Sequence, residues 1–243
     1  MSLPQFHHDR FYDLSISYHR EWDQVNCFFA PLFSFEPVRM GAFVGSVKEG
    51  GPVNFMNVKL NVHGNGTHTE CVGHLSKELI SVQTVLTSYF FVTEVLSVYP
   101  TKKENGDLAI TKHTLEAMLQ FSSATALVLR TLPNDADKRH RKYSGTNPCY
   151  IEEDAMQYIV DLGIQHLLVD IPSVDREEDG GALLSHRCFW KDSRAKDCTI
   201  TELIFVSDAI KDGQYLLYLQ LAPLHLDAVP SRPILYELNK SRD

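Results

Sequence analysis

Apolar and polar side chains alternate more regularly along residues 54–63 than elsewhere in the chain. A period of two predicts a β-strand with one buried face. The apolar positions on that face are Met56, Val58, Leu60 and Val62. His63 falls at the end of the strand on its polar face, directly before a glycine-rich stretch. We therefore expect a strand that presents a histidine at its end.

The residues after this strand predict a tight turn and a second short extended segment. Gly64 and Gly66 allow the backbone to turn sharply. If the chain extends again after the turn, His68 and Glu70 share a face, because side chains two positions apart lie on the same side of a strand. The pattern thus groups polar, ligand-type side chains on one side of this segment.

Other segments show the periodicities of helices and strands. Helices are predicted at residues 76–86, 111–120 and 152–162, and strands at residues 89–99, 124–130, 164–171, 182–190, 199–206 and 214–221. The clearest helix is 152–162, because acidic residues occupy its first turn, an apolar stripe follows, and Gly163 stands at its end. Helices and strands are interspersed without a repeat or a linker. We therefore predict an α/β fold with a mixed β-sheet and flanking helices, in a single domain of residues 1–243.

Composition excludes several classes of function. The hydrophobic content of 44% and the charged content of 22% are typical of a soluble globular protein, and the formal net charge of −8 argues against a nucleic-acid surface. No apolar run is long enough to cross a bilayer, and the first residues lack the apolar segment of a secretory signal. The five cysteines are scattered and show no Cys-x-x-Cys spacing. Reduced thiols and a cytoplasmic location are therefore expected.

Two segments carry runs of charge. Residues 134–142 are basic toward their end, and residues 175–181 are acidic and contain two glycines. We interpret both as solvated surface loops in preference to anion-binding sites, because charge runs usually face water.

Side chains that can bind a metal or carry protons are concentrated in residues 63–74. Within these twelve residues the chain places His63, His68, Glu70 and His74 around the glycine-rich turn. Neutral imidazole and carboxylate are common ligands of divalent transition metals, and a bound metal can make hydroxide available near neutral pH. The remaining histidines at 19, 113, 140, 166 and 225 fall in no such group and are expected to be structural or exposed. Cys71 is expected to be a small buried residue, and Asp170 and Asp175 to be turn or strand-end residues.

Several motifs in the same order resemble one enzyme family. They are Asp13-Leu14-Ser15, Gly66-Thr67-His68 with His74, Arg130-Thr131, Asp170-Ile-Pro172-Ser173-Val-Asp175, His186 and Glu202. Through them the chain resembles the cyclase-like metal-dependent hydrolases, which include bacterial kynurenine formamidase and isatin hydrolase. The signature of that family is His-x-Gly-Thr-His-x-Asp-x-Pro-x-His.

The resemblance implies a site and an activity. The metal ligands would be His63, His68, Glu70, His186 and Glu202, holding one or two ions of Zn²⁺ or Mn²⁺. His74 would carry protons between water and the leaving nitrogen. The implied substrate is a cyclic or aryl amide, of the arylformamidase or lactam type. The implied fold is the family's swivelling β/β/α type in a homo-oligomer, a dimer or tetramer. Partner subunits help to close the site in this family, so Trp22, Phe28 or Phe29 could line the pocket.

The chain also departs from the family signature. The first histidine of the signature aligns with Gly64, whereas this chain has His63, and the signature aspartate and proline are Glu70 and Val72. A one-residue bulge could return His63 to the ion, and the extra methylene of Glu70 could compensate. Two alternatives stay open: a non-catalytic descendant that binds a small metabolite or a partner protein, and a cyclase or dehydratase that uses the same metal site.

Overall fold

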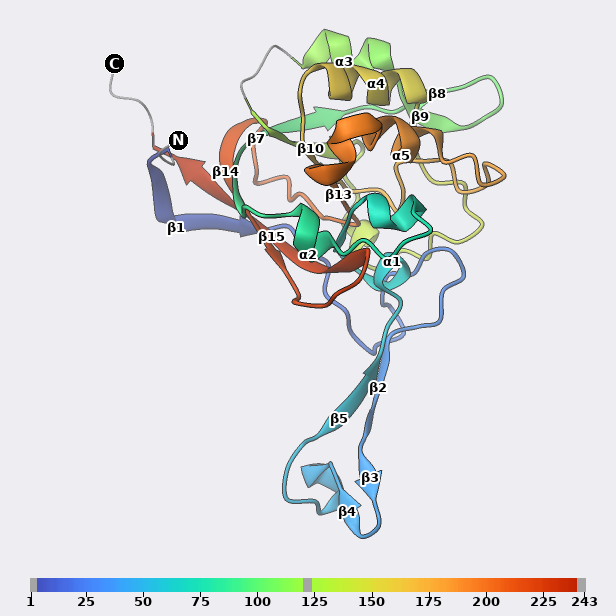
Figure 1. The fold of residues 1–243 in the computed structure, drawn as a ribbon, viewed down its shortest axis with the longest axis vertical. Coiled ribbons are helices and arrows are strands. Elements are labelled where there is room, and N and C mark those ends of the chain that lie inside the picture. Colours follow the sequence, from blue (N-terminus) through green and yellow to red (C-terminus); the bar gives the residue numbers. More distant parts are fainter. Residues whose placement is uncertain (1–3, 120–123, 240–243) are drawn as a thin grey trace.

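The computed structural model describes residues 4–119 and 124–239, and an eight-stranded sheet forms its centre (Figure 1). The strand order is β1-β15-β14-β7-β10-β12-β13-β6. The last strand in this order, β6 (His68–Glu70), also pairs with β15 (Ala228–Leu238), so the sheet closes on itself. Its other strands are β1 (Phe6–Asp13), β7 (Phe90–Val98), β10 (Ala126–Thr131), β12 (His166–Val169), β13 (Thr199–Glu202) and β14 (Gly213–Leu221).

The sheet is mixed. Strands β7, β10, β12 and β13 run parallel to their neighbours in that series, while β14, β15, β1 and β6 pair antiparallel. The α-helices are α1 (Val62–Asn65), α2 (Val82–Val85), α3 (Lys112–Met118), α4 (Glu153–Asp161) and α5 (Leu184–Phe189). Short 3₁₀ helices span Val47–Glu49, Val72–Leu75, Ala136–Arg139 and Asp192–Lys196. The predicted α/β fold with a mixed sheet and flanking helices is confirmed.

Both faces of the parallel strands are buried, as expected when helices cover one side and the closed sheet fills the other. On β10, Leu127 and Leu129 pack with Met156 of α4, while the intervening Val128 packs with Leu217 and other residues of the second apolar cluster. Helices α3, α4 and α5 lie together beside this sheet in Figure 1. The core therefore holds the parallel strands rigidly, and their ends can position functional side chains.

Most of the predicted elements are confirmed. The strands predicted at 89–99, 124–130, 164–171, 199–206 and 214–221 correspond to β7, β10, β12, β13 and β14. The helices predicted at 152–162 and 111–120 correspond to α4 and α3, although residue 120 lies outside the described residues. Thr111 caps α3 by accepting a hydrogen bond from the Thr114 N–H, as its hydroxyl chemistry favours.

The helix predicted at residues 76–86 is wrong, because only Val82–Val85 forms a helical turn. The backbone of this region is hydrogen-bonded elsewhere: Cys71 N–H donates to the Asp227 carbonyl and Val82 N–H to the Leu226 carbonyl. Gly73 is pressed against the Ile80 carbonyl, where an added Cβ would lie 2.1 Å from that oxygen. Tertiary packing against residues 226–227 thus replaces the local helix.

The strand predicted at residues 182–190 is also wrong, since α5 occupies this segment. The carboxylate of Asp175 accepts hydrogen bonds from the N–H groups of Ser185 (2.7 Å) and His186 (3.2 Å). The first-turn amides of a helix need acceptors, and here a residue about ten positions earlier supplies them. The sequence pattern of residues 182–190 gives no sign of this cap, because Asp175 lies outside the segment.

The strand predicted at residues 54–63 is shorter and lies in an unexpected place. It forms β5 (Met56–Lys59), which pairs with β2 (Ser34–Pro37), and β3 (Arg39–Met40) pairs with β4 (Phe43–Val44) beyond it. Figure 1 shows these strands projecting as an arm from the rest of the molecule. We call residues 34–59 the hairpin arm. Its alternating face does not reach the core, because Val58 is 53% exposed.

The basic segment 134–142 contains a buried ion pair, which corrects its interpretation as a purely solvated loop. Lys138 Nζ lies 2.7 Å from Asp170 Oδ2, and both side chains are buried. The Asp170 carboxylate also accepts hydrogen bonds from the N–H and the hydroxyl of Thr131. Asp170 therefore joins the end of β10 to the 3₁₀ helix that carries Lys138.

Replacing Asp170 by alanine is expected to lower the free energy of unfolding by about 3–5 kcal/mol, because it leaves the buried Lys138 ammonium without its counter-ion. Chemical denaturation followed by circular dichroism measures the change. The matched control is Glu116→Ala, which removes the exposed ion pair with Lys112 and should leave the midpoint nearly unchanged. Equal stability of the wild type and Asp170→Ala would contradict this account of the pair.

Within the described residues, no helix combines the length and apolar character needed to span a bilayer.

Candidate metal centre

His63 lies in the helical turn α1 and not at the end of a strand. The side chain of Asn61 begins this turn by accepting a hydrogen bond from the Gly64 N–H at 2.9 Å. Position 64 has no room for a side chain, since an added Cβ would lie 2.5 Å from the Ala30 Cβ. The chain therefore carries its histidine one position before the family register, and the turn of α1, not a bulged strand, directs it to the site.

Strand β6 places His68 and Glu70 on the same face, as its period of two predicts, and both side chains are completely buried. His68 Nδ1 lies 3.0 Å from the Gly66 carbonyl oxygen, so the Nδ1–H donates there and Nε2 keeps its lone pair. That Nε2 is buried and has no hydrogen-bond partner among the described residues. It points instead toward Glu202, with Oε2 at 3.4 Å.

Side chains from the second half of the chain complete the cluster. His186 on α5 brings Nε2 to 2.9 Å from Glu70 Oε1, and its Nδ1 lies 2.6 Å from Asp175 Oδ2. Glu202, at the end of β13, accepts a hydrogen bond from the Val174 N–H at 3.0 Å and lies 3.7 Å from His186 Nε2. The structure thus brings together all five sequence-predicted ligand residues.

Asp175 was expected to be a turn or strand-end residue, but its carboxylate orients His186. The contact between its Oδ2 and His186 Nδ1 fixes the orientation of the ring that presents Nε2 to Glu70. An acceptor of this kind is typical behind a metal-binding histidine. Burial opposes ionisation of Asp175, but hydrogen bonding with His186 and the charge of that residue lower its pKa.

Asp227 joins the cluster although no sequence pattern indicated it. Its Oδ2 lies 3.4 Å from His63 Nε2 and 3.6 Å from His74 Nδ1. It immediately precedes β15, and the hydrogen bond from Cys71 N–H to its carbonyl holds it beside β6. Only the pairing of β15 with β6 brings this carboxylate near the histidines, so a reading of local motifs could not find it.

His74 lies at the rim of the cluster. It belongs to the 3₁₀ helix Val72–Leu75, and its Nδ1 lies 3.8 Å from Glu70 Oε2 as well as near Asp227. Its side chain is 30% exposed, whereas those of His68 and Glu70 are fully buried. His74 therefore touches both the buried ligand-type residues and the solvent side of the site.

The electrostatics of the cluster favour bound positive charge. Burial disfavours the charged form of His63, but the carboxylates of Asp227 and Glu70 outweigh it and raise the pKa of His63 to about 10. Burial likewise disfavours charge on His186, and the carboxylates of Glu70 and Asp175 raise its pKa to about 10. Burial opposes ionisation of Glu70, yet the surrounding histidines, His186 foremost, bring its pKa well below the usual range. A cation is the natural counterpart of this set of acids.

The backbone is strained beside the cluster. Leu203, directly after Glu202, has φ of 55°, a left-handed conformation that a leucine rarely adopts. Strain of this kind persists where surrounding contacts enforce it, and it gathers at functional sites. Here the hydroxyl of Thr67 donates a hydrogen bond to the Leu203 carbonyl and accepts one from the Ile16 N–H. These bonds lock the residues next to His68 and Glu202 together.

A cavity of about 210 Å³ opens onto the cluster. Its wall includes His63, His74, His186 and Glu202 from the cluster and Phe28 from the N-terminal part of the chain. Of the three aromatic residues suggested for the pocket, only Phe28 is among the lining residues, while Trp22 and Phe29 are 87% and 79% exposed.

The acidic segment 175–181 contributes Arg176, Glu177 and Asp179 to the cavity wall, so its interpretation as purely solvated surface is corrected. Asp179 accepts hydrogen bonds from the N–H groups of Gly181 and Leu183, and Glu177 accepts one from the Gly145 N–H. These bonds fold the segment over the site.

The donor set fits a divalent metal. Two groups of side chains present ligand atoms within 4.8 Å of one another: His63 with Glu70 and His74, and His68 with Glu70 and Glu202. Glu70 belongs to both groups, and its buried Oε2 lies 3.2 Å from His63 Nδ1, while the Nε2 of His68 has no hydrogen-bond partner among the described residues. Nitrogen and oxygen donors without a thiolate suit Zn²⁺ or Mn²⁺, and the shared carboxylate is compatible with one ion or two.

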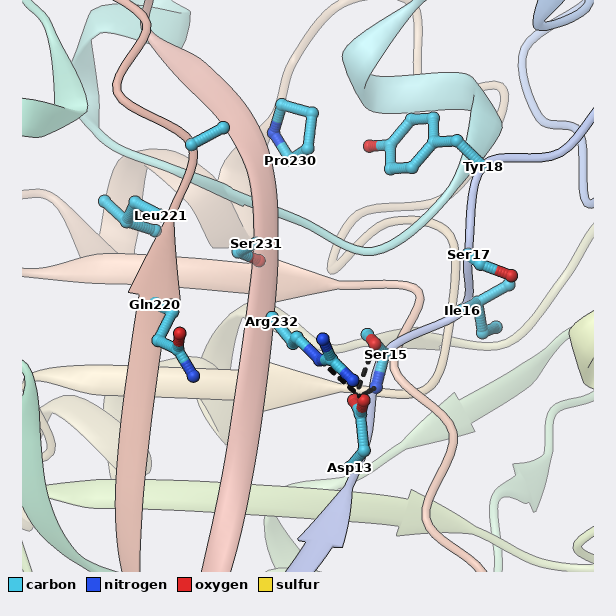
Figure 2. A pocket seen from close by; sticks show the side chains of 11 residues that line it. Asp13, Ser15, Ile16, Ser17, Tyr18, Gln220, Leu221, Pro230, Ser231 and Arg232 are labelled. Carbon is cyan, nitrogen blue, oxygen red and sulfur yellow. Dashed lines mark hydrogen bonds and ion pairs between the residues drawn. The ribbon is translucent and has the colours of Figure 1, made fainter.

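A second hollow, of about 640 Å³, lies away from the cluster between the segment after β1 and the strands β14 and β15 (Figure 2). Asp13 lies at its edge and accepts hydrogen bonds from the N–H and hydroxyl of Ser15 and from Arg232 Nε at 2.7 Å. The Asp-Leu-Ser motif thus has a structural explanation: Asp13 fixes the turn after β1 and joins it to β15.

The sheet is mixed and closed, and histidine and carboxylate side chains from both halves of the chain meet in a buried cluster. These two features define a class of protein with a candidate metal centre. The family model for cyclases matches residues 12–176. The chain therefore belongs to the cyclase family, which confirms the resemblance. His186, Glu202 and Asp227 lie beyond the matched residues.

Several solved structures share this fold. A potential metal-dependent hydrolase with cyclase activity is 16% identical, with a TM-score of 0.67, over 95% of this chain and 98% of that chain. An isatin hydrolase bound to the product analogue thioisatinate is 15% identical, with a TM-score of 0.65, over 94% of this chain and 92% of that one. Isatin hydrolase A from Labrenzia aggregata, bound to benzyl benzoate, is 14% identical, with a TM-score of 0.65, over 95% and 94%. At these identities the likeness concerns the fold. A comparison with curated proteins finds no match.

Proposed function

We propose that the protein is a metal-dependent hydrolase that cleaves the carbon–nitrogen bond of a small cyclic or aryl amide. The convergence of His68 and Glu70 on β6 with His186 and Glu202 from the second half of the chain carries this proposal. Cyclase-family membership and the fold shared with isatin hydrolases support it.

The residues that would hold the metal are His63, His68, Glu70, His186 and Glu202. When bound, the metal would make water more acidic and polarise the carbonyl of the substrate. Asp175 keeps the Nε2 of His186 aimed at Glu70, and the Gly66 carbonyl does the same for His68. Ligand orientation is thus built into the folded chain.

His74 is the proton carrier in this proposal. Its Nδ1 faces Asp227 and Glu70, and we assign the proton transfer to the opposite ring atom, Nε2. In hydrolysis, water adds to the carbonyl carbon and the carbon–nitrogen bond breaks, leaving a carboxylic acid and an amine. His74 would take a proton from the attacking water and deliver it to the leaving nitrogen. Asp227 would hold the ring in place.

The cavity indicates a small substrate. Its volume of about 210 Å³ is below the ~300–1,000 Å³ of typical drug-sized binding sites. Phe28 supplies an apolar surface on the wall, which suits an aromatic ring. A lactam such as isatin or an aryl formamide such as N-formylkynurenine combines a ring with the required carbonyl.

The test measures metal content and hydrolysis of isatin and N-formylkynurenine, with and without a chelator. Purified protein is expected to contain Zn or Mn and to lose activity on chelation, with recovery when metal is restored. Protein free of Zn, Mn, Co and Fe whose activity survives chelation would rule the mechanism out. Ligands that stabilise the protein thermally without forming product would support the non-catalytic alternative.

We also propose that the protein forms a homo-oligomer through the hairpin arm. The arm projects from the sheet (Figure 1), and it exposes several large apolar side chains: Phe35, Met40, Val47, Val53, Phe55 and Val58. An isolated two-stranded hairpin is marginal in water, and a large exposed apolar patch commonly marks an interface. A second copy of the chain would cover these side chains.

Phe55→Glu is expected to convert the oligomer into a monomer, because it places a charge within the apolar arm. Sedimentation velocity at micromolar protein measures the change. Met118→Glu replaces a similarly exposed apolar residue on α3 and serves as the control that should stay oligomeric. A wild type that sediments as a monomer would contradict the proposal.

A further inference from the structure

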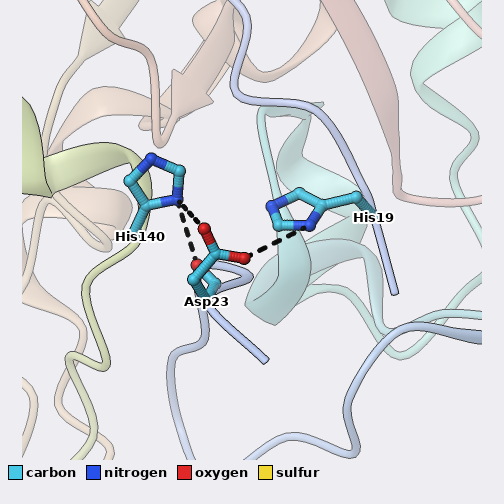
Figure 3. A group of neighbouring side chains, drawn as sticks. All are labelled: His19, Asp23 and His140. Atoms are coloured by element: carbon cyan, nitrogen blue, oxygen red, sulfur yellow. Dashed lines mark hydrogen bonds and ion pairs between the residues drawn. The ribbon is translucent and has the colours of Figure 1, made fainter. Parts of the chain in front are cut away.

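A second group of metal-ligand side chains lies outside the site described above and shares no residue with it. It consists of His19, Asp23 and His140, whose ligand atoms lie within 4.8 Å of one another. His140 Nδ1 is 3.2 Å from Asp23 Oδ2 and 3.1 Å from the Asp23 carbonyl oxygen, and His19 Nδ1 is 3.8 Å from Asp23 Oδ1. In Figure 3 the two imidazole rings face the Asp23 carboxylate from different sides.

The backbone holds the two segments of this group together. Asn26 N–H donates to the Arg141 carbonyl at 3.2 Å, and Tyr143 N–H donates to the Asn26 carbonyl at 2.8 Å. Lys142 Nζ donates to the Gln24 carbonyl, which strengthens the same junction. Because these bonds already fix residues 19–26 against residues 140–143, a ligand would not have to bring the segments together. Such preorganisation lowers the entropic cost of binding.

The side chains are accessible to an incoming ion. Those of His19, Asp23 and His140 are 28%, 33% and 49% exposed, so water can fill the remaining coordination positions. Two imidazole nitrogens and one carboxylate oxygen form a donor set that suits Zn²⁺ and its neighbours among the transition metals. The same set does not suit Ca²⁺ or Mg²⁺, which prefer oxygen donors alone.

We propose that His19, Asp23 and His140 form a second divalent transition-metal site, which binds Zn²⁺ independently of the buried cluster. The ion joins the N-terminal segment to the 3₁₀ helix Ala136–Arg139, which His140 directly follows. Phe28, on the wall of the cavity at the buried cluster, follows residues 19–26 by two positions, and the next N–H, that of Phe29, donates to the Ser144 hydroxyl. Zinc at this site therefore restrains the segment that bears a pocket residue.

The experiment titrates Zn²⁺ into metal-free protein by calorimetry, for the wild type, His140→Ala, Asp23→Asn and the control His113→Ala. His113 is exposed and belongs to neither group. The wild type and His113→Ala are expected to bind one more equivalent than His140→Ala. Asp23→Asn is expected to weaken that equivalent by more than the roughly 10–100-fold that loss of an outer hydrogen-bond partner costs. Circular dichroism of each variant verifies its fold.

Two further measurements separate this site from the buried one. In a His68→Ala background the additional equivalent should persist, whether or not the buried cluster is a metal centre. Crystals soaked in Zn²⁺ should give an anomalous peak at the zinc edge between His19, Asp23 and His140. Equal stoichiometry and affinity in the wild type and His140→Ala, or zinc binding only at millimolar concentration in both, would overturn the proposal.

Discussion

Replacing His68 by alanine is expected to abolish tight binding of a divalent metal at the buried cluster. His68 Nε2 is buried, keeps its lone pair because Nδ1 donates to Gly66, and has no hydrogen-bond partner among the described residues. An alanine removes the nitrogen donor from the group that His68 forms with Glu70 and Glu202. The loss of affinity should exceed the roughly 10–100-fold expected when an outer partner of a ligand is removed.

Metal content by mass spectrometry and calorimetric titration measure this loss. His166→Ala is the matched control, because His166 is also a buried histidine on a strand of the same sheet, where its Nδ1 contacts the Thr199 hydroxyl. It should keep the metal even if it destabilises the fold. Asp175→Asn should fall between the two, about 10–100-fold weaker in metal affinity, because it weakens the contacts that orient His186 without removing a ligand. A His68→Ala protein with wild-type metal content would remove the basis of the proposed function.

Replacing His74 by alanine is expected to leave the metal in place and to lower the turnover rate by about 10²–10⁴-fold. His74 lies on the rim of the site, 30% exposed, with its ring against Asp227 and on the wall of the cavity. A group in this position can exchange protons with a molecule in the cavity. The rate should therefore depend on His74 far more than the affinity for the ion does.

The ratio of metal content to turnover distinguishes the two roles, with His113→Ala, an exposed histidine on α3, as the control. Ligand atoms of His74, His63 and Glu70 also lie within 4.8 Å of one another. The experiment therefore decides whether His74 carries protons or binds the metal. If His74→Ala loses the ion as completely as His68→Ala does, His74 is a ligand and the proposed division of roles is wrong.

Much of the fold follows from local patterns. Apolar runs predict the strands β7 and β10, and an apolar stripe predicts the helix α4. These predictions need no information about distant residues. The wrong predictions share a cause. The segments 76–86 and 182–190 take their shapes from partners far away in the chain: the carbonyls of Leu226 and Asp227 for the first, and the Asp175 carboxylate for the second.

The candidate site likewise contains residues that local spacing predicts and residues that only tertiary contacts bring in. His68 and Glu70 could be placed on one face from their spacing alone. His63 could be suggested only as a residue near the turn, since the crowding of Gly64 against Ala30 that explains its position is a tertiary fact. Asp227 could not be found at all, because it follows no motif and reaches the cluster only through the pairing of the final strand.

The pairing of β6 with β13 and β15 determines when the cluster can form during synthesis. Strand β6 is held between β13 and β15, and both emerge from the ribosome more than a hundred residues after it. A nascent chain that already displays His63 to His74 lacks the opposing histidine and carboxylates until residues 186–227 have been made. The cluster can therefore assemble only after β15 has been made, and capture of an ion there would report that β6 has paired with both of its partner strands.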